Sequence, residues 1–175
     1  MSSIWNKGLK FSFFGESHGK LIGVSIDNLP PEIKLNLIRN FISRRSTSNF
    51  NFGVSSRNET DKFKIISSFF NGKTSESPLC ALFTNKKHDS SNYDKFKNFI
   101  RPVDLTANIR YSGFNDYRGA GHLSGRLTLP LTFVGAVCEQ ILKLNHIQTF
   151  MHIYSFGNIN DLSLLNRKIN YLNLK

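Results

Sequence analysis

Alternating apolar and polar residues near the start of the chain predict a pair of strands. The alternation runs through residues 9–14 and again through residues 22–27, and Gly15 and Gly19 bound the segment between them. A period of two is typical of a half-buried strand, and glycine permits a sharp change of direction. We therefore predict a hairpin whose bend contains residues 15–19.

Two later segments have the spacing of amphipathic helices. Residues 31–45 place four apolar side chains on one helical face: Leu37, Ile38, Phe41 and Ile42. Residues 130–144 begin with a proline, which suits a first helical turn, and repeat apolar residues at intervals of three and four: Leu131, Val134, Val137, Cys138, Ile141 and Leu142. This second segment is predicted to be a core helix. A short helix is predicted over residues 92–100, ended by Arg101–Pro102.

The remaining segments complete a mixture of strands, helices and loops. Asn71–Gly72, a pair that favours positive φ, separates apolar runs at 62–70 and 78–84 and predicts a second hairpin. A further strand is predicted over residues 148–155, and a loop over residues 46–57. Strands interspersed with helices place the chain in the α+β class.

Composition and charge narrow the possible functions. Of 175 residues, 39% are hydrophobic and 13% aromatic, which is enough to build a core, and no linker divides the chain, so residues 1–175 are predicted to form a single domain. Lysine and arginine total 23 against 12 acidic residues, a net charge of +11 with a pI near 9.9. This excess favours an anionic partner such as a phosphate, a carboxylate or a nucleic acid.

The sequence gives no sign of export, membrane insertion or a cysteine framework. Its start lacks the pattern of a secretory leader, and the longest apolar run, residues 127–138, is too short to cross a bilayer. Cys80 and Cys138 are far apart and form no CxxC pair, so neither a disulfide framework nor a metal site is expected. A cytoplasmic location is therefore predicted.

The predicted hairpin bend carries the most informative motif, Phe14-Gly-Glu-Ser-His-Gly19. A histidine at such a bend can exchange a proton near neutral pH. A solvated turn histidine without a function is the alternative. A nucleophilic pair of Ser17 with His18 is disfavoured, because adjacent residues on an extended chain point in opposite directions.

A second cluster lies just before the predicted core helix. Within residues 116–126, four polar or basic side chains surround three glycines: Arg118, His122, Ser124 and Arg126. Backbone N–H groups and a helix N-terminus at that point would suit a phosphate. The spacing is neither a Walker loop nor GxGxxG, so a glycine-rich loop with solvated arginines remains the alternative.

Nucleic-acid binding is the rival explanation for the positive charge. Basic and aromatic residues are interleaved around residues 50–52 and 95–97. No RRM, KH or helix-turn-helix pattern accompanies them, so a nucleic-acid partner is not expected.

Several motifs in order resemble the N-terminal half of the chorismate synthase family. Phe14-Gly-Glu-Ser-His-Gly19 and the exit Asp27-Asn-Leu-Pro30 resemble the first motif of that family. Asn115-Asp-Tyr-Arg-Gly-Ala-Gly121 and Ser124-Gly-Arg126 resemble the second. The resemblance implies about half of a layered β-α-β sandwich.

The resemblance also implies an activity and a substrate site. The family converts 5-enolpyruvylshikimate 3-phosphate to chorismate and phosphate by 1,4-elimination, a step of the shikimate pathway that leads to aromatic amino acids. By resemblance His18 would protonate the departing phosphate, and Ser17, Arg45 and Arg126 would line the substrate pocket. A basic chain suits this small substrate, which carries two carboxylates and a phosphate.

A flavin cofactor and an assembly follow from the same resemblance. Reduced FMN is required although no net redox change occurs, and NADPH is a candidate reductant. His122, Leu123 and Ser124 match the family positions that hold the phosphate region of the flavin. Family members are homotetramers, so a homo-oligomer is expected, and no membrane partner is.

The chain departs from the family pattern in three places and in length. Arg101-Pro-Val-Asp-Leu-Thr106 stands where the family has a second catalytic histidine, Arg44-Arg-Ser-Thr-Ser-Asn49 replaces an Arg-Arg-x-Pro-Gly motif, and Asn28 replaces a glycine. Family chains are about twice as long. A truncated, catalytically inactive remnant that binds anions or associates with itself is therefore the alternative function.

Overall fold

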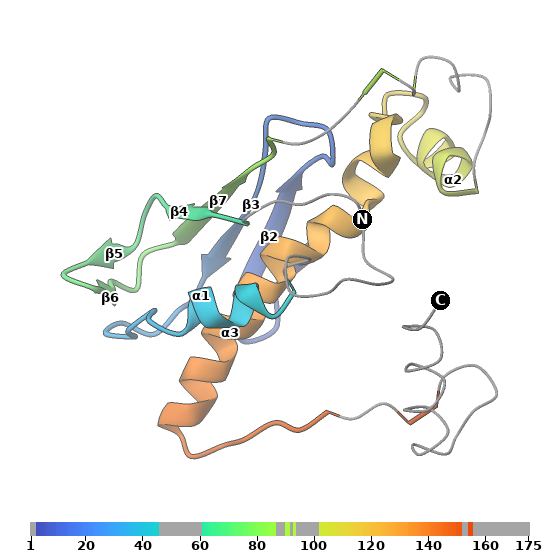
Figure 1. Ribbon diagram of the computed structural model, residues 1–175. Helices are drawn as coiled ribbons and strands as arrows, with labels where there is room; N and C mark the ends of the chain where they lie inside the picture. Colours follow the sequence, from blue (N-terminus) through green and yellow to red (C-terminus); the bar gives the residue numbers. More distant parts are fainter. Residues whose placement is uncertain are drawn as a thin grey trace.

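An antiparallel sheet of five strands forms one layer of the molecule (Figure 1), in the order β1-β2-β3-β7-β4. In that order the strands are Ile4–Trp5, Lys10–Gly15, Leu21–Asp27, Leu79–Thr84 and Phe63–Ile65. The computed structural model describes residues 3–45, 61–86, 90–91, 93, 102–151 and 154–155. The predicted first hairpin is confirmed, because β2 and β3 pair from Lys10 with Asp27 to Gly15 with Ile22.

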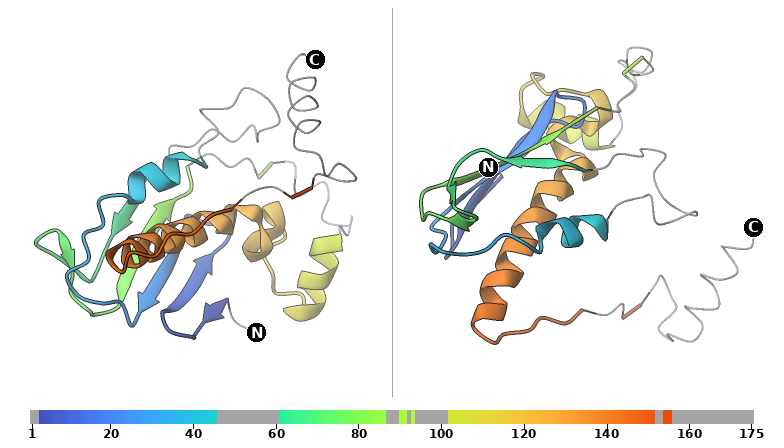
Figure 2. Two further views of the ribbon diagram at one scale, coloured as in Figure 1. Left: turned by 90° about the horizontal axis from the view of Figure 1, so that it is seen from below. Right: turned by 60° about the vertical axis from the view of Figure 1, so that its left-hand side comes forward.

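Two helices cover one face of this sheet. The longer, α3, spans Thr128–Leu144, and the short α1 spans Ile38–Ser43 beside it (Figures 1 and 2). A third helix, α2, spans Pro102–Arg110 and lies near the N-terminal end of α3 (Figure 1). Two 3-10 segments, η3 at Arg118–Leu123 and η4 at Gly125–Leu127, connect α2 to α3. This arrangement confirms the α+β class.

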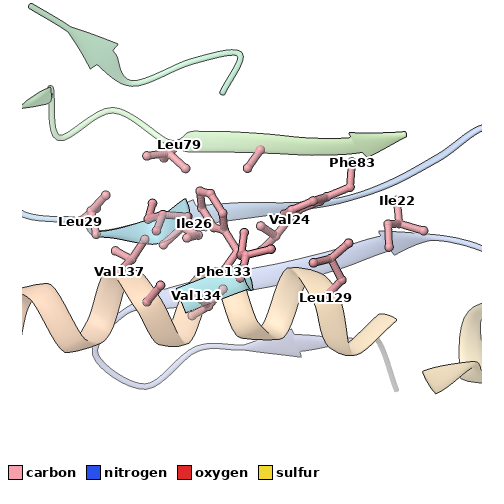
Figure 3. Close-up of a cluster of buried hydrophobic side chains, with 14 residues drawn as sticks. Ile22, Val24, Ile26, Leu29, Leu79, Phe83, Leu129, Phe133, Val134 and Val137 are labelled. Carbon is pink, nitrogen blue, oxygen red and sulfur yellow. The ribbon is translucent and has the colours of Figure 1, made fainter. Parts of the chain in front are cut away.

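The core lies between α3 and the sheet (Figure 3). Alternate residues of the two central strands are fully buried there: Ile22, Val24 and Ile26 of β3, and Leu79, Ala81 and Phe83 of β7. Phe133 of α3 packs edge-on against Phe83 at a centroid distance of 5.8 Å. Burying one such side chain stabilises the fold by about 1.5–3 kcal/mol, so this layer fixes α3 on the sheet.

The predicted core helix is confirmed, although its buried stripe differs slightly from the expected one. α3 begins at Thr128, so Pro130 lies in its first turn as predicted. Val134 and Val137 are buried as expected, whereas Leu131 is 49% exposed. Residues 118–144 are long and apolar enough to span a membrane by length and composition, but the backbone is non-helical at 119–121, and one side of α3 packs on the sheet. α3 is therefore a core helix.

The helix predicted over residues 31–45 is wrong in its first half. Glu32 has a φ of 64°, and its N–H donates to the Thr74 carbonyl at 2.9 Å. Ile33 and Thr74 are joined by further hydrogen bonds, Ile33 N to Thr74 Oγ1 at 3.0 Å and Thr74 N to Ile33 O at 3.1 Å. This pairing removes the backbone groups that a helix would use, so α1 contains only residues 38–43. Ile38 and Ile42 are buried, as the pattern predicted.

The second hairpin forms at the predicted turn but has short arms. Asn71 and Gly72 have φ values of 49° and 79°, as their sequence favours. They join β5, Phe69–Phe70, to β6, Lys73–Thr74, and these two strands form a separate small sheet. The flanking β4 and β7 pair within the main sheet.

Two other predictions are corrected, and two lie outside the described residues. Pro102 begins α2, where proline is tolerated in the first turn, whereas we expected it only to end a helix. Residues 148–151 and 154–155 form no strand, and the side chains around Phe150 are exposed without a partner strand in the described part of the chain. The loop at 46–57 and the helix at 92–100 fall outside the described residues, apart from Tyr93.

Candidate functional site

The two sequence motifs meet at the bend between β2 and β3. The backbone N–H of Ser17 donates to the Gly121 carbonyl at 3.0 Å. A Cβ placed on Gly119 would lie 2.7 Å from His18 Nε2 and 3.0 Å from Ser17 Oγ, which is closer than side chains normally approach. The Ser17 and His18 side chains therefore lie directly against the backbone of the glycine-rich segment.

Unusual backbone angles in η3 make this close approach possible. Gly119, Ala120 and Gly121 follow one another with φ values of 56°, 64° and 53°, and ψ of Gly121 is −125°. That last combination is accessible essentially to glycine alone. A Cβ on Gly121 would also overlap the Asp116 carbonyl oxygen. The glycines are thus required for the turn as well as for its contact with His18.

The imidazole of His18 is half-buried and held from two sides. Its Nδ1 is 2.9 Å from Ser90 Oγ, and its ring meets the ring of Tyr93 edge-on at 5.0 Å. Beside the bend opens a cavity of about 540 Å³, lined by Glu16, Gly19, Ser90 and residues 115–118. A small polar ligand could enter here next to the His18 turn.

An acidic and a basic side chain of the second motif, both among the residues that line this cavity, form an ion pair. Arg118 donates through Nε to Asp116 Oδ1 and through its second terminal nitrogen to Oδ2, each at 2.9 Å. These hydrogen bonds hold the pKa of Asp116 below its ordinary value, and the charge of His18 lowers it further. Burial of the carboxylate opposes this shift in part. The bidentate pair fixes residues 116–118 beside the imidazole.

The two arginines expected to bind substrate converge on one carboxylate, Asp61. Arg126 donates to Oδ1 at 2.5 Å and Arg45 to Oδ2 at 3.2 Å. The side chains of Asp61 and Arg126 are only 7% and 8% exposed, whereas Arg45 is 27% exposed and also donates to Thr128 Oγ1 at 3.1 Å. Burial lowers the pKa of Arg45, Asp61 opposes this effect and Arg126 adds to it. The guanidinium stays charged even so.

Asn85 connects this charged group to the His18 turn. Its side-chain Nδ2 donates to three carbonyl oxygens of the bend, those of Glu16 at 3.2 Å, Ser17 at 3.3 Å and Gly19 at 3.0 Å. Its Oδ1 accepts from Arg126 Nε at 3.1 Å. Asn85 is buried at the end of β7, so a strand of the central sheet positions both parts of the site.

The residues expected at the flavin have other partners. His122 Nδ1 is 2.8 Å from the Gly15 carbonyl oxygen, and its Nε2 is 2.6 Å from Ser3 Oγ. Because a carbonyl only accepts, Nδ1 carries the proton of that bond. Ser124 Oγ accepts from the Arg126 backbone N–H at 3.3 Å, and Leu123 is 41% exposed. These three residues lie on the same segment as Gly119 and adjoin the His18 turn.

The structure therefore brings most of the expected site residues together and adds two that sequence reasoning missed. The turn that carries Ser17 and His18 is linked to Arg126 through Asn85, which bonds the carbonyls of Ser17 and Gly19, and Arg126 is linked to Arg45 through Asp61. Asn85 and Asp61 belong to no motif. Their positions just after the predicted strand 78–84 and just before the run 62–70 were the available signal, since polar residues at strand ends often line sites.

Comparison with known proteins identifies the family. Residues 9–174 match the family model for chorismate synthase. The chain is 39% identical over 158 residues to the chorismate synthase of Thermococcus kodakarensis, covering 87% of this chain and 44% of that protein. It is 35% identical over 163 residues to the one from Dehalococcoides mccartyi, covering 91% of this chain and 44% of that protein. The chain belongs to the chorismate synthase family, and it spans less than half the length of these relatives.

The fold comparison agrees with the sequence. A solved structure described as "Crystal Structure of Chorismate Synthase" superposes with a TM-score of 0.56 at 26% identity. The match covers 79% of this chain and 35% of the solved one. The predicted family and the predicted fold class are thereby confirmed.

Proposed function

We propose that this chain carries the proton-donating part of a chorismate synthase site, which releases phosphate from 5-enolpyruvylshikimate 3-phosphate by 1,4-elimination to give chorismate. The observation that carries the proposal is the direct contact between the Ser17–His18 turn and the glycine-rich segment, with Ser17 N 3.0 Å from Gly121 O. Family membership supplies the reaction class. In the family this is a carbon–oxygen lyase reaction of the shikimate pathway.

The geometry suits protonation of a departing phosphate by His18. Ser90 engages Nδ1, and Nε2 and Cδ2 are the ring atoms that lie toward Gly119. An imidazole titrates near neutral pH, so Nε2 can hold a proton and deliver it to an oxyanion that comes within hydrogen-bond distance. Ser17 would donate a hydrogen bond from its hydroxyl to the same substrate.

Arg45 and Arg126 would attract and orient the anionic substrate. Together with Asp61 they leave one net positive charge in a largely buried group, where an anion interacts more strongly than in water. Arg45 is the more exposed of the two, so we propose that it makes direct contact with a substrate carboxylate or phosphate. Arg126 would hold the anion nearer to the His18 turn, to which the hydrogen bond with Asn85 connects it.

The family cofactor, reduced FMN, supplies reducing chemistry without net redox change, and the described residues fit its phosphate region in part. Leu123 offers an exposed apolar surface and Ser124 a hydroxyl. Both ring nitrogens of His122 are engaged by Gly15 and Ser3, so His122 would shape this region rather than donate to the flavin. NADPH as the reductant, assembly as a homotetramer and a cytoplasmic location belong to the same proposal.

Flavin binding and product formation test the proposal. The purified chain is mixed with chemically reduced FMN and 5-enolpyruvylshikimate 3-phosphate under anaerobic conditions, and chorismate and phosphate are measured. We expect chorismate from the unaltered chain and a loss of at least about a hundredfold in His18→Ala, within the usual range for removing a general acid. His146→Ala, which changes an exposed histidine after α3, is the matched control and should retain the rate.

Two results would contradict the proposal. Absence of chorismate with the unaltered chain, together with no change in flavin absorbance at high micromolar FMN, would favour an inactive anion-binding remnant. Retention on heparin with a steep salt dependence, in a protein that ignores FMN, would favour nucleic-acid binding instead.

A further inference from the structure

Asp61 has a position that none of the motifs explains. Its side chain is only 7% exposed, and each carboxylate oxygen accepts from a different guanidinium. A buried carboxylate is costly unless both oxygens are satisfied, and here two arginines satisfy them. Its φ of 44° is one that aspartate tolerates better than most residues.

Asp61 is also the element that allows Arg45 and Arg126 to lie close together. Two guanidiniums repel each other strongly in a partly desolvated site, and a carboxylate between them converts this repulsion into two attractions. Arg45 belongs to the chain after α1 and Arg126 to η4, so one carboxylate joins two segments that are remote in sequence.

Asn85 extends this connection to the turn that carries His18, the proposed proton donor. Its amide accepts from Arg126 Nε and donates to the carbonyls of Ser17 and Gly19, which flank His18. A continuous polar path therefore runs from Arg45 to the His18 turn, with each link between 2.5 and 3.3 Å. Such connected polar networks, in a largely buried setting, impose a defined geometry.

We propose that Asp61 and Asn85 are positioning residues, which hold the arginine pair as a preformed site for a phosphate or carboxylate at a fixed distance from His18. Their role in catalysis rests on the proposed function above, whereas their effect on Arg126 does not. Asp61 remains bound to the arginines when an anion arrives, because the Asp61–Arg126 pair is almost fully buried.

The test observes Arg126 itself. In the ¹⁵N-labelled full chain, the Nε–H resonance of Arg126, assigned with Arg126→Lys, should exchange with water at least about tenfold more slowly than that of the exposed Arg39, because Asn85 accepts its hydrogen bond. In Asp61→Asn and in Asn85→Ala the exchange should accelerate about tenfold toward the Arg39 rate. Glu32→Gln, which makes the same carboxylate-to-amide change in the exposed pair with Lys73, should leave Arg126 unchanged.

Anion affinity provides the second readout. Inorganic phosphate is titrated into each variant, and we expect a dissociation constant about tenfold higher in Asp61→Asn although that variant is more positive, a change of about 1.4 kcal/mol. Tighter phosphate binding would show that Asp61 competes with anions, and it would overturn the proposal.

The spectroscopic readout separates this proposal from the proposed function. Should the wild-type Arg126 Nε–H exchange as fast as that of Arg39, the positioning role is wrong, and this result needs neither Asp61→Asn nor Asn85→Ala. Failure to form chorismate or to bind FMN would contradict the proposed function alone, since the Arg126 resonance does not depend on either ligand.

Discussion

Replacing Gly119 by alanine tests the contact between the two motifs directly. The added Cβ would lie 2.6 Å from His18 Cδ2 and 2.7 Å from Nε2, whereas ordinary contacts begin near 3.4 Å. The imidazole would therefore have to retreat by roughly 0.8 Å, the difference between the shortest contact and an ordinary one. The bond to Ser90 and the packing on Tyr93 resist that movement.

The expected loss of stability has two parts that can be measured separately. Alanine at a φ of 56° costs about 1–2 kcal/mol through the backbone alone, and the overlap with His18 adds about 1–3 kcal/mol, as overpacking does elsewhere. Gly8→Ala is the matched control, because Gly8 has a φ of 69° and nothing within 4 Å of the new Cβ. It carries the backbone cost without the overlap.

Thermal unfolding and imidazole NMR distinguish the two variants. At about 2–4 °C per kcal/mol for a chain of this size, Gly119→Ala should melt at least about 2 °C below Gly8→Ala. The ring resonances of His18 should shift in the first variant and stay in place in the second. Equal melting temperatures with an unmoved His18 signal would refute the inferred contact between the bend and the glycine-rich segment.

Two further predictions concern the packing of the core and the loss of stability at low pH. Phe133→Ala should destabilise the fold by about 3–5 kcal/mol in chemical denaturation, because its ring is fully buried against the sheet, whereas Leu131→Ala on the exposed side of α3 should change it by less than about 0.5 kcal/mol. Because Arg118 lowers the pKa of Asp116, that carboxylate stabilises the fold above its unfolded pKa, near 3.8, and this contribution disappears as the pH falls through the lower folded value. Arg118→Ala should therefore flatten the loss of stability below about pH 4 in an acid titration monitored by circular dichroism, and an unchanged acid limb would contradict this assignment.

Elements set by local patterns were predictable from the sequence, and elements set by distant partners were not. The β2–β3 hairpin and α3 follow directly from periods of two and of three to four, because each buries one face on the core. The first half of the helix predicted over 31–45 fails because Thr74, some forty residues away, takes its backbone hydrogen bonds. Pro102 illustrates a local ambiguity, since a proline that is read from the sequence as a helix end can equally begin a helix, as it does in α2.

In the candidate site too, residues within local motifs were predictable, and residues that depend on distant partners were not. Motifs identified Ser17, His18 and the glycine-rich segment, since glycines at tight spacing mark unusual backbone positions. Asp61 and Asn85 were missed because their only signal was a position at the end of a predicted strand, which many other polar residues share. Their importance arises only when β4 and β7 pair and bring both side chains to Arg126.

The hydrogen bond between Ser3 and His122 connects the N-terminal edge of the sheet to the candidate site. Fraying of β1 would release His122 from one of its two anchors and loosen its hold on the Gly15 carbonyl at the end of β2. Detachment of the first strand is then coupled to the position of His122 beside the glycine-rich segment. An affinity tag fused next to Ser3 would therefore act on the position of His122 as well as on β1, and its placement affects the site as well as the purification.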